Sequence, residues 1–182
     1  MLTTTPTPAP TPAPTPAPTP APTPAPTPAS ASASGDPHLV NVHGQRFDLY
    51  QAGLHTLIRI PKTAARHKTS FLVQATATRL GTGCEDMYFT KVNITGIWAR
   101  EHRREDLHFM AEEPRRGRPK WNTFHHVGVK VVHGHVFKGT RYLNIFVRGL
   151  NRAKFSIGGL LGEDDHTAAN TKPAGCRHVV SI

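Results

Sequence analysis

The chain has 182 residues and a formal net charge of +10, and its first 34 residues differ in kind from the rest. Those 34 residues hold 12 of the 17 prolines and no charged residue, so the remaining 148 carry every Lys, Arg, Asp and Glu. A segment of that length is the usual size of one domain. No apolar run approaches the about 20 residues of a membrane-spanning helix, which excludes a helical membrane span.

Residues 1–34 are expected to form a disordered linker or stalk, and residues 35–182 a single domain. From Thr5 to Pro28 every second residue is proline, with threonine and alanine between, and Ala29–Ser34 continues with small residues. Proline favours extended polyproline II geometry, and the tract has too little apolar surface to form a core. A stiff spacer is the first interpretation. An O-glycosylated stalk and a ligand for proline-reading domains are the alternatives.

The residues after Gly35 are predicted to form an all-β domain. Short runs with apolar residues at every second position alternate with glycine-containing turns, which is the pattern of half-buried strands. This spacing suits an antiparallel meander, sandwich or flattened barrel. The charged stretch Arg100–Asp106 is expected to form a short helix at most. Strands are expected at Leu39–Val42, Phe47–Tyr50, Leu54–Ile60, Phe71–Thr78, Met87–Ile94, Val127–Val132, Tyr142–Arg148 and Lys154–Ile157.

Two motifs stand at the ends of the predicted domain. The segment Gly35–Asp48 begins Gly-Asp-Pro-His and continues with a strand, a turn at His43-Gly44 and a second strand that contains Phe47. The segment Gly158–Asp165 reads Gly-Gly-Leu-Leu-Gly-Glu-Asp-Asp. Together they resemble the opening and the closing loop of the von Willebrand factor type D domain, in a divergent and cysteine-poor form. We expect the amino-terminal hairpin and this closing loop to lie side by side.

The resemblance implies a calcium ion between the turn after the first strand and the closing loop. At the matching positions this chain has His43, Glu163, Asp164 and Asp165. Carboxylates suit calcium, whereas His43 offers nitrogen. Two alternatives stand beside calcium. Asp164 and Asp165 would cap a turn through nearby backbone amides, or a softer metal would be held by His43, Asp165 and His166.

The Asp36–Pro37 bond is a second feature that the resemblance concerns. In gel-forming mucins and inter-alpha-trypsin inhibitor heavy chains, the same GDPH sequence is cleaved between Asp and Pro, which implies cleavage here. The Asp36 carboxyl would attack its own main-chain carbonyl while His38 assists the movement of the proton. Cleavage would separate the stalk from the domain and leave a reactive anhydride. The alternative is an uncleaved strand entry with proline at its first residue.

Two cysteines and one glycosylation sequon are relevant to whether the chain is secreted. Cys84 and Cys176 are compatible with one disulfide that closes a loop of about 90 residues, and two free thiols are the alternative. Asn93-Ile94-Thr95 is an acceptor for N-glycosylation if the chain is secreted. Protonation of the 12 histidines would strengthen binding to polyanions as the pH falls.

A basic segment between two predicted strands offers a rival function. Pro114–Lys120 contains a core that resembles an AT-hook, in which an extended Arg-Gly-Arg lies in the narrow minor groove of A·T-rich DNA. A solvated basic loop and a grip on sulfated glycans are the other interpretations, because any polyanion releases counterions on binding. The AT-hook core is Arg116-Gly117-Arg118-Pro119, and the candidate polyanion-binding residues are Arg115, Arg116, Arg118 and Lys120.

The predicted function is therefore non-enzymatic. No sequence motif of a hydrolase elbow, a phosphate-binding loop or a zinc protease is present. We expect an extracellular adhesion, matrix or mucus-type module that binds other macromolecules, among them sulfated or sialylated polyanions. DNA binding is the alternative. The first residues lack the regions of a secretory signal, so the expected location outside the cell or in a secretory lumen implies a piece of a longer chain.

Overall fold

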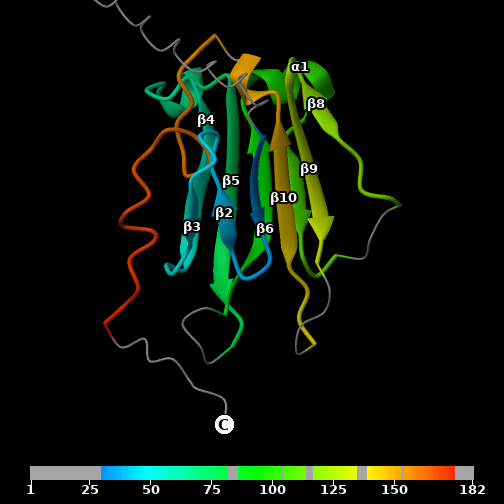
Figure 1. Ribbon diagram of the computed structural model, residues 1–182. Helices are drawn as coiled ribbons and strands as arrows, with labels where there is room; N and C mark the ends of the chain where they lie inside the picture. The colour runs from blue at the N-terminus through cyan, green and yellow to red at the C-terminus, as the bar shows by residue number, and fades with distance from the viewer. Residues whose placement is uncertain are drawn as a thin grey trace, which may run out of the picture.

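The computed structural model describes residues 30–81, 86–103, 105–113, 117–134, 139–152 and 154–174. They form two antiparallel sheets packed as a sandwich (Figure 1), so the predicted all-β class is confirmed. The six-stranded sheet has the order β3-β2-β1-β10-β9-β8, and the four-stranded sheet has the order β4-β5-β6-β7. Within the described ranges, no helix is both long and apolar enough to cross a membrane.

The strands of the six-stranded sheet are β1 (Ser30–Ser34), β2 (His38–Val40), β3 (Arg46–Asp48), β8 (Asn122–Phe124), β9 (Val127–His133) and β10 (Leu143–Arg148). Those of the four-stranded sheet are β4 (Gly53–Ile60), β5 (Phe71–Arg79), β6 (Met87–Thr95) and β7 (Leu107–Met110). The helical elements are α1 (Ile97–Arg103) and two short 3₁₀ helices, η1 (Arg66–Lys68) and η2 (Leu150–Arg152).

The core lies between the two sheets and follows the alternation of apolar residues. In β10, Leu143, Ile145 and Val147 are buried, and the residues between them face outward. Aromatic side chains fill the centre, where Phe71 of β5 and Phe124 of β8 lie with ring centroids 5.1 Å apart. Side chains of successive residues point to opposite faces of a strand, so this period of two is what the sequence pattern had indicated.

Strand β1 is a correction to the predicted domain boundary. Ser30–Ser34, assigned above to the linker, pairs with β10 on one side and with β2 on the other. Ala31 and Ala33 are buried in the core, at 3% and 0% exposure. The alternation of serine and alanine has the period of a strand, but small residues have weak strand propensity. The strand therefore depends on its two neighbours, which the local sequence does not reveal.

Four other elements differ from the expectation, which included no strand at the positions of β7 and β8. Strands β7 and β8 are short, and β7 is half exposed, so neither has a long alternating pattern. The expected strand at Lys154–Ile157 is absent from the described residues, although the adjacent Gly158 forms a single bridge with Arg59. The short helix begins earlier than Arg100–Asp106, directly after Gly96, whose φ of +111° turns the chain out of β6.

A buried asparagine builds the turn between β2 and β3. Asn41 is 1% exposed, and its Oδ1 accepts hydrogen bonds of 3.0 Å from the backbone amides of His43 and Gln45. Gly44 takes a φ of +77°, which favours glycine. This turn sets the register of the hairpin, in which His38 lies opposite Asp48.

The closing loop joins the edges of the two sheets. Gly158 exchanges two hydrogen bonds of 2.8 Å with Arg59 of β4, and the Leu161 amide donates to the carbonyl of Leu57 at 2.9 Å. The Leu161 carbonyl then accepts a hydrogen bond of 3.0 Å from the amide of Val42, next to β2. The expectation that the hairpin and the closing loop lie side by side is confirmed, as Figure 1 shows at the edge formed by β3.

Candidate functional site

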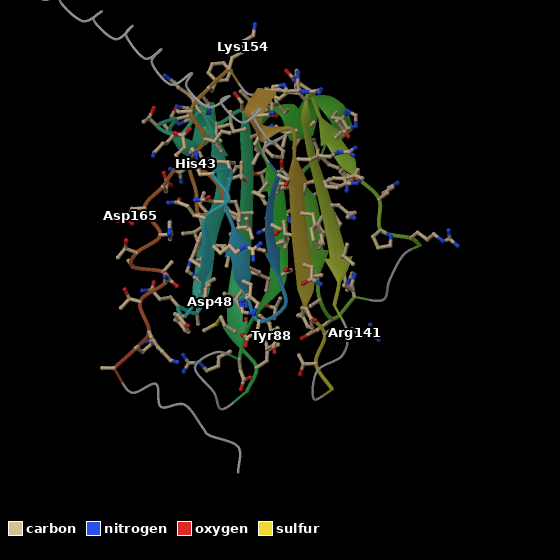
Figure 2. The ribbon with its side chains drawn as sticks, viewed as in Figure 1. His43, Asp48, Tyr88, Arg141, Lys154 and Asp165 are labelled. Atoms are coloured by element: carbon tan, nitrogen blue, oxygen red, sulfur yellow. The ribbon has the colours of Figure 1, made fainter. Side chains whose placement is uncertain are left out.

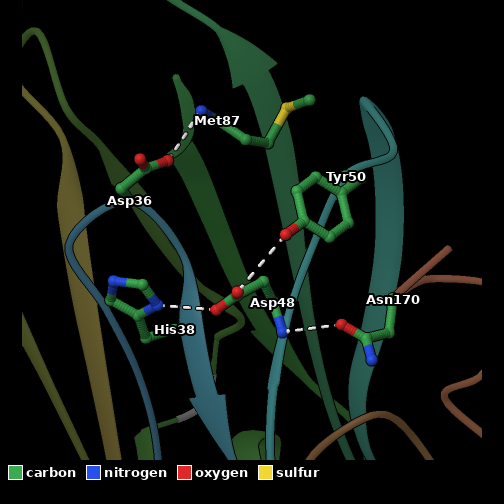
Figure 3. Close-up of polar contacts among 6 residues, drawn as sticks. All are labelled: Asp36, His38, Asp48, Tyr50, Met87 and Asn170. Carbon is green, nitrogen blue, oxygen red and sulfur yellow. Dashed lines mark hydrogen bonds and ion pairs between the residues drawn. The ribbon is translucent and has the colours of Figure 1, made fainter. Parts of the chain in front are cut away.

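The turn between β1 and β2 holds the Asp36–Pro37 bond at the junction of the two sheets. Gly35 has a φ of +70°, and its amide donates to Oδ1 of Asn144 in β10 at 2.8 Å. The next residue, Asp36, accepts a hydrogen bond of 3.0 Å from the backbone amide of Met87 in β6 (Figure 3). Pro37 is buried. Contacts from both sheets therefore hold the turn, and the amide of Met87 holds the Asp36 carboxylate.

A histidine–carboxylate pair lies next to this turn. Nδ1 of His38 lies 2.6 Å from Oδ1 of Asp48, and the two side chains are 71% and 45% exposed. The Tyr50 hydroxyl donates to the other oxygen of Asp48 at 3.4 Å, and the Asp48 amide donates to Oδ1 of Asn170 at 3.0 Å (Figure 3). Asp48 thus orients the imidazole, and the segment after the closing loop holds Asp48 in turn.

These groups surround a small cavity. It has a volume of ≈ 150 Å³, which is enough for a few water molecules or the tip of a side chain. The carbonyl of Pro37 accepts a hydrogen bond of 3.3 Å from the amide of Leu49, which closes one side. The described residues that line the cavity are Asp36, Pro37, His38, Asp48, Leu49 and Tyr50.

The pKa of the buried Tyr88 responds to the negative charge of Asp36. Burial raises the pKa of Tyr88 above its usual 10.0, and the carboxylates of Asp36 and Asp86 and the hydroxyl of Tyr142 raise it further. The rings of Tyr88 and Tyr142 lie 5.0 Å apart. Tyr88 therefore stays neutral near neutral pH, and Figure 2 shows it toward the same end of the sandwich as Asp48.

The structure brings the three residues of the predicted cleavage site together with two that sequence analysis missed. Asp36 has its carboxyl next to its own carbonyl, and the imidazole of His38 contacts Asp48, which Tyr50 contacts in turn. The register could have indicated Asp48, because a hairpin centred on the predicted turn at His43-Gly44 pairs it with His38. No signal in the sequence pointed to Tyr50 as a partner of Asp48.

No protein-family model matches the chain, and a search of curated proteins finds no match. The resemblance to von Willebrand factor type D domains therefore stays a prediction from two motifs.

Two residues of the predicted metal site, Asp164 and Asp165, cap turns. Oδ2 of Asp164 accepts a hydrogen bond of 2.6 Å from the Gly159 amide. Oδ1 of Asp165 accepts bonds from the hydroxyl and the amide of Thr167 at 2.7 and 2.9 Å, and these bonds lower the pKa of Asp165 below its usual range. This arrangement fits the turn-cap alternative.

The same residues do not fit a calcium cage. The ammonium group of Lys62 lies 3.3 Å from Oδ1 of Asp164 and donates to the carbonyl of Glu163 at 3.0 Å, so a side-chain cation already lies against these oxygens. His166 stacks on Phe47, with ring centroids 4.1 Å apart. Although His43 and Asp165 lie along one edge in Figure 2, no group of three His, Cys, Asp or Glu side chains in the described ranges is arranged to hold a metal.

The remaining predicted site residues divide between described and undescribed parts of the chain. Asn93 lies half buried in the middle of β6, with its Oδ1 2.9 Å from Nδ1 of His108 in β7. Arg118 and Lys120 are exposed in the segment before β8. The residues that lie outside the described ranges are Cys84, Arg115, Arg116 and Cys176.

Proposed function

We propose that this chain is a non-enzymatic interaction module of the extracellular space or a secretory lumen that binds other macromolecules and cleaves its own Asp36–Pro37 bond. The turn between β1 and β2 carries the proposal. There the Met87 amide holds the Asp36 carboxylate at 3.0 Å, and the pair of His38 and Asp48, 2.6 Å apart, lines the same cavity as the scissile bond.

The bond between Asp36 and Pro37 would be broken by groups of this site, and only the final opening of the anhydride needs an outside nucleophile. One carboxyl oxygen of Asp36 bonds to the carbon of its own main-chain carbonyl and closes a cyclic anhydride. The bond from that carbon to the Pro37 nitrogen breaks, and its electron pair stays on the nitrogen. The nitrogen takes a proton from the protonated ring of His38, whose Nδ1 lies 2.6 Å from Oδ1 of Asp48. Water or another nucleophile then opens the anhydride.

The position of β1 links this chemistry to binding. The activated acyl group belongs to Asp36, so it stays on the fragment that ends there. An amine or hydroxyl of a second macromolecule that opens the anhydride becomes covalently joined to that fragment. Because Ser30–Ser34 lies between β2 and β10, the fragment is retained by backbone hydrogen bonds after the cut. Cleavage by itself would not release the stalk, and a captured partner would stay on the domain.

The proposal is tested by incubating the full chain at about pH 5 and following the amino termini by mass spectrometry. We expect a new terminus at Pro37 in the unchanged protein and none in Asp36→Asn, which keeps the size of the side chain but lacks the carboxyl. His38→Gln and Asp48→Asn should slow cleavage by about 100-fold, because each weakens the proton donor.

Two controls separate this chemistry from acid hydrolysis of a labile bond. Glu112→Gln removes an exposed carboxylate elsewhere and should cleave like the unchanged chain. The chain unfolded in urea should cleave more slowly than the folded one, because unfolding separates His38 from Asp48. The absence of a terminus at Pro37 in the folded chain, or equal cleavage of the folded and unfolded chains, would refute the proposal.

A further inference from the structure

The whole net charge of the chain lies in one continuous stretch, residues 114–162. This stretch contains no Asp or Glu, whereas the 12 basic and 12 acidic residues in the rest of the chain balance. It includes β8, β9 and β10, three neighbouring strands of the six-stranded sheet that carry Lys130 and Arg148 and no acidic residue. Its ten basic residues are Arg115, Arg116, Arg118, Lys120, Lys130, Lys138, Arg141, Arg148, Arg152 and Lys154.

Two of these cations are held against aromatic rings on the outer face of that sheet. Nζ of Lys130 lies 5.1 Å from the ring centroids of both Trp121 and Phe146. The guanidinium carbon of Arg148 lies 4.2 Å from the ring centroid of Trp121. Lys130 is half exposed and Arg148 is exposed, so both can reach a ligand. We call these four residues the cation–ring patch.

The register of the strands builds the patch. Lys130 of β9 lies opposite Phe146 of β10, and Gly128 lies opposite Arg148. A Cβ atom at Gly128 would lie 2.9 Å from Nε of Arg148 and 3.3 Å from Cε3 of Trp121. The absence of a side chain at Gly128 therefore leaves the space that Trp121 and Arg148 occupy. Two cations are thus pre-positioned, which lowers the entropy lost when a ligand orders them.

Hydroxyl groups continue this face beyond β10. In β1, Ser30 lies opposite Arg148 and Ser32 lies opposite Phe146, and the serines face outward because Ala31 and Ala33 are buried. The sequences of β1, β8, β9 and β10 contain no Asp or Glu. An anion on this face would therefore meet cations and hydroxyl donors without a nearby carboxylate from these strands.

We infer that the cation–ring patch binds a sulfated glycan chain. Sulfate groups match the two fixed cations, and sugar hydroxyls match the serines of β1. The faces of the Trp121 and Phe146 rings are covered by Lys130 and Arg148. These ring faces therefore hold the cations and are not free for the stacking of nucleic acid bases. The inference deepens the proposed function and rests on it for the location, because sulfated glycans are extracellular.

The test is calorimetric titration of the full chain with heparin between about 0.05 and 0.5 M salt. We expect an affinity that falls with salt, and no binding to chemically desulfated heparin. Lys130→Gln and Arg148→Gln should each reduce the magnitude of the slope of log affinity against log salt by about one. The double variant should bind heparin at least about tenfold more weakly than the unchanged chain. Arg148→Lys should keep the slope but weaken binding, because lysine keeps the charge and loses the flat contact with Trp121.

A matched control distinguishes the patch from net charge. Lys91→Gln removes the same charge from an exposed position in β6 of the other sheet and should change the affinity less than twofold. Equal weakening by Lys91→Gln, tighter binding to single-stranded DNA than to heparin, or no binding to heparin would each overturn the inference. Asp36→Asn should bind heparin like the unchanged chain, so a failure of cleavage and a failure of glycan binding give different results.

Discussion

One ring nitrogen of His126, Nε2, is buried and has no hydrogen-bond partner within the described part of the chain. Burial lowers the pKa of this imidazole from its usual 6.5, and positive charge at His125 and Arg152 lowers it further. The ring packs edge-on to Trp98, with centroids 5.5 Å apart. At the scale of single residues, folding therefore favours the neutral form of His126, and this preference makes stability depend on pH.

Replacing His126 by phenylalanine is expected to flatten the acid dependence of stability. Below pH 6.5 the unfolded chain takes up a proton at this position that the folded chain resists. The stability present above that pH is therefore lost as the pH falls through the lowered pKa of the folded state. The free energy of unfolding, measured in urea at about pH 7 and pH 5, should change less for His126→Phe than for the unchanged protein.

The control for this prediction is His43→Gln, at an exposed histidine in the turn between β2 and β3. It should keep the acid dependence of the unchanged chain. If His126→Phe and the unchanged protein lose the same stability over this pH range, His126 is not the group responsible.

Among the elements, the closing loop packs on β4 through backbone hydrogen bonds, at positions where glycine has no side chain. The register shift in β4 between Thr56 and Ile58 leaves Leu57 without a partner in β5, and its carbonyl accepts the Leu161 amide. Gly159 has a φ of +93°, and a Cβ atom there would lie 2.4 Å from the Leu57 carbonyl oxygen. A glycine-rich loop can approach β4 this closely, whereas a loop with side chains at these positions would be pushed away.

Gly159→Ala is expected to destabilise the domain by about 4 kcal/mol or more, because it adds a steric clash to an unfavourable φ. Gly44→Ala is the matched variant. Gly44 has a φ of +77° but nothing within 4 Å of the added Cβ, so it should cost only about 1–2 kcal/mol. Urea unfolding measures both. Equal costs would mean that the loop does not pack on β4 as closely as described.

At the scale of the whole molecule, β1 completes the six-stranded sheet. It separates β2 from β10, so the two hairpin strands at one end and the three strands at the other are joined only through it in this sheet. It also leads directly into the turn that holds Asp36 against β6. The fold of the domain and the geometry of the candidate cleavage site therefore depend on the same five residues, Ser30–Ser34.

Deletion of residues 1–34 is expected to destabilise the domain by about 5 kcal/mol or more, because β2 and β10 lose their backbone partners. Deletion of residues 1–29 keeps β1 and should leave the unfolding midpoint in urea unchanged. The difference between the two truncated chains measures the contribution of β1 alone. Equal midpoints for the two would contradict the central position of this strand.

The sequence predicts much of the fold but less of the candidate site. Long strands such as Leu54–Ile60 and Met87–Ile94 have a clear alternation, and both appear in the structure as β4 and β6. A short motif points to Asp36 and His38 as candidates for a cleavage site. It does not point to Asp48, because the contact between Asp48 and His38 follows from the pairing of β2 with β3. The Lys62 ammonium group against the acidic turn was also missed, because 101 residues separate it from Glu163.

The all-β class, the position of most strands and the turn at His43-Gly44 can be predicted from the order of the residues, since alternation and turn residues act over a few neighbouring positions. Three features become visible only in the folded chain: Ser30–Ser34 is a central strand, the acidic turn is capped by its own chain, and Lys130 and Arg148 lie on one patch with two rings. The physical reason is that strand pairing joins residues far apart in the chain, and its register is set by the packing of the whole sandwich.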